Sequence, residues 1–160
     1  MISTDEFRET VGRFATGVTV ITTRDEEGSP MGFTANAFAS FSLDPPSVLV
    51  SVDENIDTYP LLRKEEVFFA VNILADHQEE LAQTFTSKGG SEKFEGVEHY
   101  EETTGAPIFE DVLAFLECRA VERFDRGDHM ILIGEALNMA VDEDAEPLLF
   151  YRGEFSSLHA

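Results

Sequence analysis

The sequence has few of the residues on which several common classes of protein depend. Its 160 residues include a single cysteine, Cys118, which excludes an internal disulfide and any metal site built from several cysteines. No apolar run approaches the roughly 20 residues that cross a bilayer. The polar N-terminus predicts no signal peptide. These absences favour a cytoplasmic protein, and the length supports one domain over residues 1–160 with a single core.

Positive charge is also scarce. The chain carries 32 acidic and 11 basic residues, for a formal net charge of −21. Such a surface repels nucleic acid and anionic membranes, so we exclude both as partners. The high acid and low lysine content favours a halophilic protein, because concentrated salt screens the repulsion between carboxylates. Equal stability in molar salt and in dilute buffer would rule out that adaptation.

The segment 31–52 places small polar side chains around a turn. Asp44-Pro45-Pro46 interrupts it, since neither proline can sit inside a strand ladder, and a β-prone run follows. Hydroxyl and amide groups beside such a turn can hold a phosphate with few cations. A β-rich core whose serines bond to the backbone explains the same pattern. The polar residues concerned are Thr34, Asn36, Ser40, Ser42 and Ser51.

Hydrophobic periodicity predicts a mainly β fold. Apolar spacing, capping boxes at Ser3–Glu6 and Asp76–Glu79, and Pro60 at a first turn predict short helices over 4–15, 59–63 and 77–86. Alternating or continuous apolar residues predict strands over 17–23, 31–34, 47–52, 67–74, 112–124, 129–137 and 148–151.

Two pairs of these strands flank short turns, so we expect two hairpins, 18–23 with 31–34 and 112–124 with 129–137. Within 112–124, one face is apolar and includes Cys118 as a buried core thiol. The opposite face turns polar at Glu117 and Arg119. Hairpins with few helices indicate an antiparallel β-barrel or sandwich with peripheral helices.

Five segments, in this order and spacing, resemble the flavin reductase-like, FMN-binding split-barrel family. Its members are the short-chain reductase components of two-component flavin monooxygenases. The segments are FRETVGRFATGVTVITT (7–23), GFTANAFASFSLDPPSVLVSV (32–52), FFAVNILADHQEELAQTF (68–85), TGAPIFEDVLAFLECRAVERFDRGDHMILIGEAL (104–137) and PLLFYRG (147–153). The resemblance covers nearly the whole chain. It implies a split barrel of the antiparallel Greek-key type, a homodimer, FMN or FAD as cofactor and NAD(P)H as hydride donor.

The resemblance also implies residue roles. His129, in Gly127-Asp128-His129, matches the histidine that lies near the nicotinamide. Ile56 stands where the family often has serine, a departure within the phosphate segment. The positions that match the family's flavin contacts are Thr34, Ala35, Asn36, Ser40, Ser51, Val52, Asn55, Thr58, Phe85, Lys88, Tyr151 and Arg152.

Charge supports two of these positions independently. In a chain this acidic, a phosphate dianion needs close cations, and Lys88 and Arg152 are two of few candidates. A solvated loop lysine and an arginine paired with Glu154 are the alternatives. His129 at the start of a strand is equally compatible with an ordinary turn residue.

The sequence therefore predicts an NAD(P)H:flavin oxidoreductase that passes reduced flavin to a separate monooxygenase. The flavin carries the chemistry, and His129 orients the nicotinamide. One alternative is a non-catalytic FMN-binding or electron-transfer protein on the same barrel. Another is a haem-handling module, which is disfavoured because no two of the four histidines have ligand spacing. They are His77, His99, His129 and His159.

Overall fold

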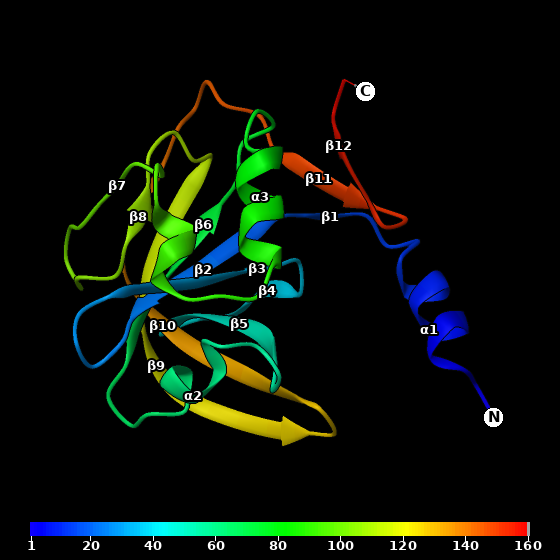
Figure 1. The fold of residues 1–160 in the computed structure, drawn as a ribbon, viewed down its shortest axis with the longest axis horizontal. Coiled ribbons are helices and arrows are strands. Elements are labelled where there is room, and N and C mark those ends of the chain that lie inside the picture. The colour runs from blue at the N-terminus through cyan, green and yellow to red at the C-terminus, as the bar shows by residue number, and fades with distance from the viewer. Residues whose placement is uncertain (160) are drawn as a thin grey trace.

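A seven-stranded antiparallel sheet forms the body of the protein in a computed structural model that describes residues 1–159 (Figure 1). The edge strand β3 also contacts β5, so the sheet curls into a barrel. This confirms the predicted fold class. In spatial order the strands are β3 (Pro30–Ala35), β2 (Thr19–Arg24), β6 (Phe68–Ile73), β9 (Ala114–Arg126), β10 (His129–Val141), β5 (Pro46–Asp53) and β4 (Phe38–Leu43).

Smaller elements surround the barrel. The helix α3 (Glu79–Thr86) packs on β2 and β3, and the one-turn helix α2 (Tyr59–Leu62) follows β5. A 3-10 helix, η1 (Ser91–Phe94), comes after α3. The remaining elements are α1 (Thr4–Val11), β1 (Thr16–Gly17), β7 (His99–Tyr100), β8 (Ile108–Phe109), β11 (Leu148–Tyr151) and β12 (Glu154–Ser157).

Both predicted hairpins are present. Strands β2 and β3 pair from Thr19–Ala35 to Arg24–Pro30, and β9 and β10 pair along almost their whole lengths. Strand β4 is missing from the prediction because it is an edge strand whose side chains are mostly exposed, so it shows no apolar alternation. The same reason explains β12, which lies at the edge of a small sheet with β11 and β1.

The helix boundaries differ from the prediction at two ends. The Ser3–Glu6 capping box is confirmed, but α1 ends at Val11 because Gly12 caps it. The predicted cap at Asp76 is wrong, since α3 begins at Glu79 after Gln78. The Gln78 side chain accepts from the Ala75 amide and donates to the Glu110 carbonyl, and so closes the turn before the helix.

The barrel interior is closely packed. Cys118 is fully buried, as predicted, and burial raises the pKa of its thiol to about 12. At Gly134 on β10, an added Cβ would lie 2.9 Å from the Cβ of Cys118 and would also meet the Phe69 ring. The close approach of β10 to Phe69 and Cys118 therefore requires glycine at this position.

Glu117 departs from the predicted pattern, because it is buried rather than solvated. The backbone amides of Thr103 and Thr104 and the side-chain amide of Asn138 all donate to its carboxylate. Burial alone raises a carboxyl pKa, but these hydrogen bonds outweigh it and hold the pKa of Glu117 below its ordinary value. Arg119, on the same face, is exposed as expected.

None of the helices within residues 1–159 combines the length and apolar character that a membrane crossing requires.

Candidate functional site

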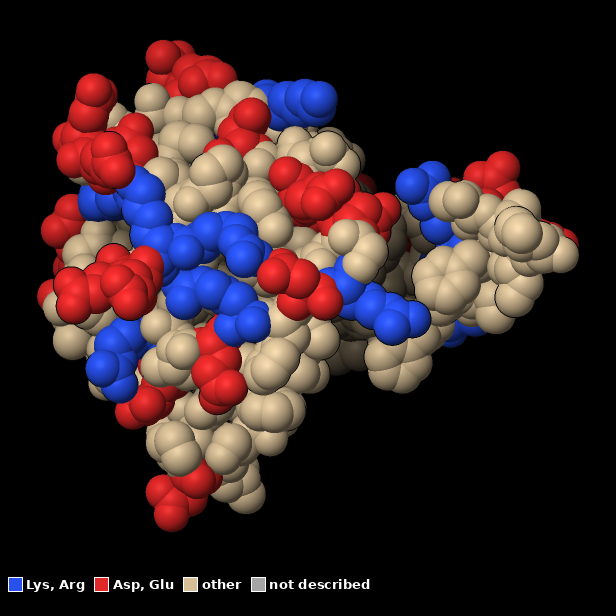
Figure 2. Space-filling model, turned by 90° about the horizontal axis from the view of Figure 1, so that it is seen from below, with Lys and Arg blue, Asp and Glu red and all other residues tan. Residues whose placement is uncertain are grey.

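A cleft separates the barrel from an arm that is built from both ends of the chain. The arm consists of α1 and β1 from the N-terminal end and of the β11–β12 hairpin from the C-terminal end. Figure 1 shows α1 standing away from the barrel, and Figure 2 shows the hollow between them from below. This hollow has a volume of about 710 Å³. The arm contributes Val11, Phe14 and Thr16 to its lining, and the barrel contributes Leu49 and Ile131. Its walls are therefore largely apolar and come from both ends of the chain.

A second hollow of about 470 Å³ adjoins the first and is lined by Thr34, Gln83 and Thr86. The two hollows share Asn36 and Gly153, and with them Phe150. They therefore form one cleft that runs from the arm to the C-terminal end of α3. Because its total size suits a multi-ring ligand, this cleft is the candidate functional site.

The segment at the end of β3 lies in the middle of this cleft. Thr34 lines it, and its Oγ1 donates to the Ala82 carbonyl on α3 at 2.6 Å. Ala35 accepts at its carbonyl from Thr19 Oγ1 at 2.7 Å, so β3 holds its end rigidly. The exposed Asn36 follows directly. The structure thus places Thr34 and Asn36 together in the cleft, whereas Ala35 between them packs against the barrel core.

Ser51 joins them from the neighbouring strand β5. Its backbone amide donates to the Ala37 carbonyl at 3.0 Å, which fixes β5 beside the residues after β3. Ser51 lines the larger hollow. Ser40 lies close by on β4 but is exposed, and it is its neighbour Ala39 that lines the hollow.

The cleft also contains a polar atom that sequence reasoning missed. The Oγ1 atom of Thr16 is buried in the wall of the larger hollow and makes no hydrogen bond within residues 1–159. A buried hydroxyl without a partner is unfavourable unless a ligand or a partner chain supplies one. A flavin, with its carbonyl and ring nitrogen atoms, fits such a wall of apolar surface and single polar groups. The only sequence signal for Thr16 was its place between a helix and a β-prone run.

His129 lines neither hollow, but it lies on β10 two residues before Ile131, which does. It shares a face of β10 with Ile131, and it pairs across the ladder with Asp53. Its Nδ1 lies 2.7 Å from Asp128 Oδ1. That hydrogen bond and the nearby imidazole hold the pKa of Asp128 below its ordinary value. The carboxylate therefore fixes the orientation of the ring, and Nε2 makes no hydrogen bond within residues 1–159.

Tyr151 is the last residue of β11 and Arg152 begins the turn to β12, and both are exposed. Arg152 has a φ of +53°, in the left-handed region, and its backbone amide donates to the Gly12 carbonyl at 3.0 Å. This bond ties the hairpin to the end of α1. Gly153, the next residue, lines both hollows, so the turn borders the cleft.

Three predicted site residues have their side chains in the core instead. Val52 is fully buried, and Thr58 and Phe85 are each only 1% exposed. Phe85 packs edge-on against Phe94, with ring centroids 4.9 Å apart. These residues therefore leave only backbone atoms for contact with a ligand.

Asn55 and Lys88 lie on two loops that meet beyond the end of α3. The Asn55 backbone and side-chain amides both donate to the Asp53 carboxylate, at 2.9 and 3.2 Å. Lys88 is exposed and makes no ion pair within residues 1–159. The amide of Gly89 donates to Asp57 at 2.9 Å, which joins the two loops.

Most other cations are engaged elsewhere. Arg63 pairs with Asp125 at 2.5 Å, and Lys64 pairs with Glu26 at 2.5 Å. On the face of the molecule shown in Figure 2, a band of basic side chains is bordered by acidic side chains. Lys88 and Arg152, by contrast, have no ion-pair partner in the described part of the chain. They are therefore available to an anionic ligand.

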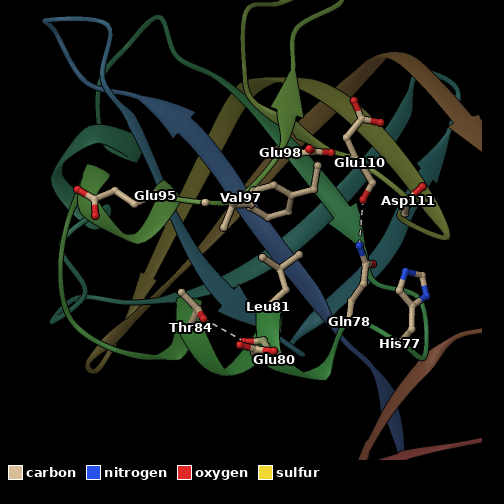
Figure 3. A pocket seen from close by; sticks show the side chains of 12 residues that line it. His77, Gln78, Glu80, Leu81, Thr84, Glu95, Val97, Glu98, Glu110 and Asp111 are labelled. Atoms are coloured by element: carbon tan, nitrogen blue, oxygen red, sulfur yellow. Dashed lines mark hydrogen bonds between the residues drawn. The ribbon is translucent and has the colours of Figure 1, made fainter.

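A separate hollow of about 510 Å³ lies on the other side of α3 (Figure 3). Carboxylates surround it, and Gln78 spans its wall by bonding to the Glu110 carbonyl. Across residues 1–159, no group of three histidine, cysteine or acidic side chains is placed to hold a metal ion. None of the predicted site residues lines this hollow, so it is not the candidate site.

The barrel with its cleft of hydroxyls, amides and apolar walls defines a protein of the flavin-binding class. Residues 11–159 match the model of the flavin reductase like domain, and the chain belongs to that family. This confirms the resemblance seen in the sequence segments.

Relatives with named activities support the assignment of the chain to this family. The chain is 40% identical over 149 residues to the FMN reductase (NADH) SmoA of Agrobacterium fabrum, covering 93% of this chain and 83% of the relative. It is 36% identical over 152 residues to HsaB of Rhodococcus jostii, the reductase subunit of a flavin-dependent monooxygenase, covering 95% and 76%. The solved structure of the NADH:FAD oxidoreductase SgcE6 of Streptomyces globisporus, with NAD and FAD fragments, superposes with a TM-score of 0.90 at 34% identity, covering 96% of this chain and 92% of the other.

Proposed function

We propose that this protein is an NAD(P)H-dependent flavin reductase whose flavin lies in the cleft between the barrel and the arm. The observation that carries the proposal is the position of Thr34, Asn36 and Ser51 in one cleft, in a chain of the flavin reductase family. Thr34, Asn36 and Ser51 would hold FMN or FAD there, and the flavin would supply the redox chemistry as the acceptor of a hydride from the nicotinamide.

The protein supplies position and electrostatics. The end of β3 offers backbone amides at Ala35 and Asn36 toward the ring, where they stabilise the negative charge that reduction adds. Because Thr34 is held by Ala82, this segment needs little rearrangement to bind. His129, oriented by Asp128, positions the nicotinamide and transfers no proton. Tyr151 and Arg152 border the ring from the hairpin turn, and Lys88 approaches from the far end.

A second copy of the chain completes this site. No residue of α1 is buried, although its apolar face carries Phe7 and Val11, and Phe14 beyond it is 80% exposed. The outer face of the barrel exposes Phe41 and Met139 in turn. Exposed apolar patches of this kind mark protein interfaces. We therefore propose a homodimer in which each arm packs against the partner's barrel beside the cleft.

The physiological setting follows from the relatives and the composition. HsaB is named as the reductase subunit of a monooxygenase, and we propose that this protein likewise delivers reduced flavin to a separate monooxygenase. The single cysteine favours the cytoplasm. The net charge of −21 favours a cell interior rich in salt, where screening relieves the self-repulsion.

The activity is tested by following NADH and NADPH oxidation at several salt concentrations, with and without added flavin. We expect oxidation only when a flavin is present. Bound yellow chromophore without oxidation of either nucleotide would instead favour a non-catalytic flavin-binding protein.

The role of His129 is tested with His129→Ala and with the conservative His129→Asn, which keeps a hydrogen-bonding side chain. We expect His129→Ala to raise the KM for the nicotinamide nucleotide more than it lowers kcat, with partial rescue in His129→Asn. An unchanged KM in His129→Ala would show that the histidine does not position the nucleotide.

A further inference from the structure

Beyond the C-terminal end of α3, two consecutive backbone amides face carboxylates of the chain itself. The amide of Gly89 donates to Asp57 Oδ2, and the amide of Gly90 donates to Glu92 Oε1, each at 2.9 Å. These glycines follow α3 shortly after Thr86, which lines the cleft. Adjacent amides in such a loop are groups that otherwise hold an anion. Here the chain's own acidic residues occupy them.

Both carboxylates are close to each other and to this loop. The hydrogen bond from Gly90 holds the pKa of Glu92 below its ordinary value, while the charge of Asp57 acts in the opposite direction. Glu92 also sits directly against the loop, because a Cβ on Gly89 would collide with its Oε1 atom. The two acids therefore form a negatively charged wall between Asn55 and Lys88, the residues at which the proposed function puts the flavin phosphate.

The neighbouring groups compensate for this charge only in part, because Lys93 attracts both carboxylates but makes its hydrogen bonds elsewhere. Asp53 and Glu54 lie on the same turn as Asp57, and Asp53 occupies both donors of Asn55. The Lys93 ammonium faces inward and donates to the carbonyls of Gly32 and Ser87, each at 3.0 Å. Lys88 is then the cation left to meet a phosphate in this region.

We propose that Asp57 and Glu92 determine flavin specificity by excluding the phosphate, so that the ring and ribityl chain carry the recognition. The inference rests on the proposed function and refines it. Riboflavin lacks the phosphate and meets no repulsion at this wall, whereas FMN carries a dianion toward it. In dilute buffer the enzyme accordingly uses riboflavin at least as well as FMN.

Salt gives this mechanism a distinct signature. Repulsion between exposed charges several ångströms apart is strongly screened in molar salt. The KM for FMN therefore falls as salt rises, and the KM for riboflavin changes less. The ratio of the two KM values removes any general effect of salt on the stability of the enzyme.

The test is the steady-state KM for riboflavin and for FMN at saturating NADH, in dilute buffer and in molar KCl. It compares the wild type with Asp57→Asn and Glu92→Gln, which keep the shape and an acceptor oxygen. Glu143→Gln, in the exposed turn after β10, removes the same charge elsewhere. In dilute buffer we expect Asp57→Asn to lower the KM for FMN roughly fivefold and Glu92→Gln to lower it less, because repulsion between two unit charges about 4 Å apart in water corresponds to about a fivefold factor in affinity.

The riboflavin KM stays constant in both variants, and Glu143→Gln changes neither KM. A wild-type enzyme with a much lower KM for FMN than for riboflavin would overturn the proposal. So would an Asp57→Asn variant that shifts both KM values equally or neither. Absence of NADH oxidation with any flavin is a different result, since it would refute the reductase function itself.

Discussion

The barrel and the arm differ in where their apolar side chains find partners. The barrel buries Ile21, Phe69 and Leu132 completely within one chain. The arm leaves Phe7 and Phe14 exposed, and α1 buries nothing. The core of the barrel is thus complete within one chain, whereas the apolar side chains of the arm need another surface. The difference indicates that the barrel supplies most of the stability. The arm supplies exposed apolar surface that is available to a ligand or to a second chain.

The buried polar groups of the barrel and of the arm also differ in whether they find hydrogen-bond partners within one chain. In the barrel, four donors from Thr103, Thr104 and Asn138 satisfy the buried carboxylate of Glu117. In the arm, the buried hydroxyl of Thr16 makes no hydrogen bond within residues 1–159. Buried polar groups in folded proteins normally make hydrogen bonds. A buried hydroxyl without one, beside a cleft, therefore indicates a position where a ligand or a partner chain supplies the missing hydrogen bond.

The largest effect is expected from overfilling the barrel. Gly134→Val places a branched side chain against Phe69 and Cys118, and we expect it to lower the free energy of unfolding by about 3 kcal/mol or more. Denaturant unfolding in molar salt measures the change. The matched control is Gly17→Ala on β1, where an added Cβ meets nothing within 4 Å. Equal stability of the two variants would show that the barrel is not tightly packed at this crossing.

A smaller effect is expected from the buried carboxylate. Glu117→Gln turns an NH2 group toward donors that need an acceptor, at a cost of about 2 kcal/mol near neutral pH. Because the folded pKa lies below the ordinary value of 4.5, this stabilisation is present above that value and is lost as pH falls through the folded pKa.

The measurement is the free energy of unfolding from neutral pH down to the acid range. The difference between the wild type and Glu117→Gln should shrink as pH falls. Glu122→Gln, exposed on the same strand, should show no such difference at any pH. A constant difference across the range would mean that ionisation of Glu117 does not contribute.

The smallest effect on barrel stability is expected from the arm. Phe7→Ser combined with Phe14→Ser should change the unfolding free energy of the barrel by less than about 0.5 kcal/mol, because neither side chain is buried in one chain. The same variant should convert a dimer into a monomer in analytical ultracentrifugation. Val121→Ser, exposed on β9, is the control that should leave the mass unchanged. A monomeric wild type would contradict the proposed homodimer.

The sequence predicted the barrel well because its strands have strong local signals. The runs around Val71 and Leu132 are apolar and β-branched, and short turns fix their hairpins. Strands β4 and β12 escaped prediction because exposed edge strands show no burial pattern. The burial of Glu117 was not predicted, because its hydrogen-bond donors come from residues 103–104 and 138 and no local sequence pattern indicates such a contact.

The site was predictable only through the family motifs. Thr34, Asn36 and Ser51 do line one cleft, but the burial of Thr58 and Phe85 depends on long-range packing that spacing does not reveal. Thr16 and Phe150 also line the cleft, and although both fall within family segments, neither was predicted to contact the flavin. Asp57 stands in the predicted phosphate segment, and its role depends on the loop that packs against it.

The most direct test of the central claim is a crystal structure of the protein grown in molar salt with riboflavin and NAD⁺. The account predicts a dimer with the isoalloxazine ring in contact with Thr34, Asn36 and Ser51, between the barrel and an arm. A ring bound in the acidic hollow beside Gln78, or on a monomer with an empty cleft, would contradict it.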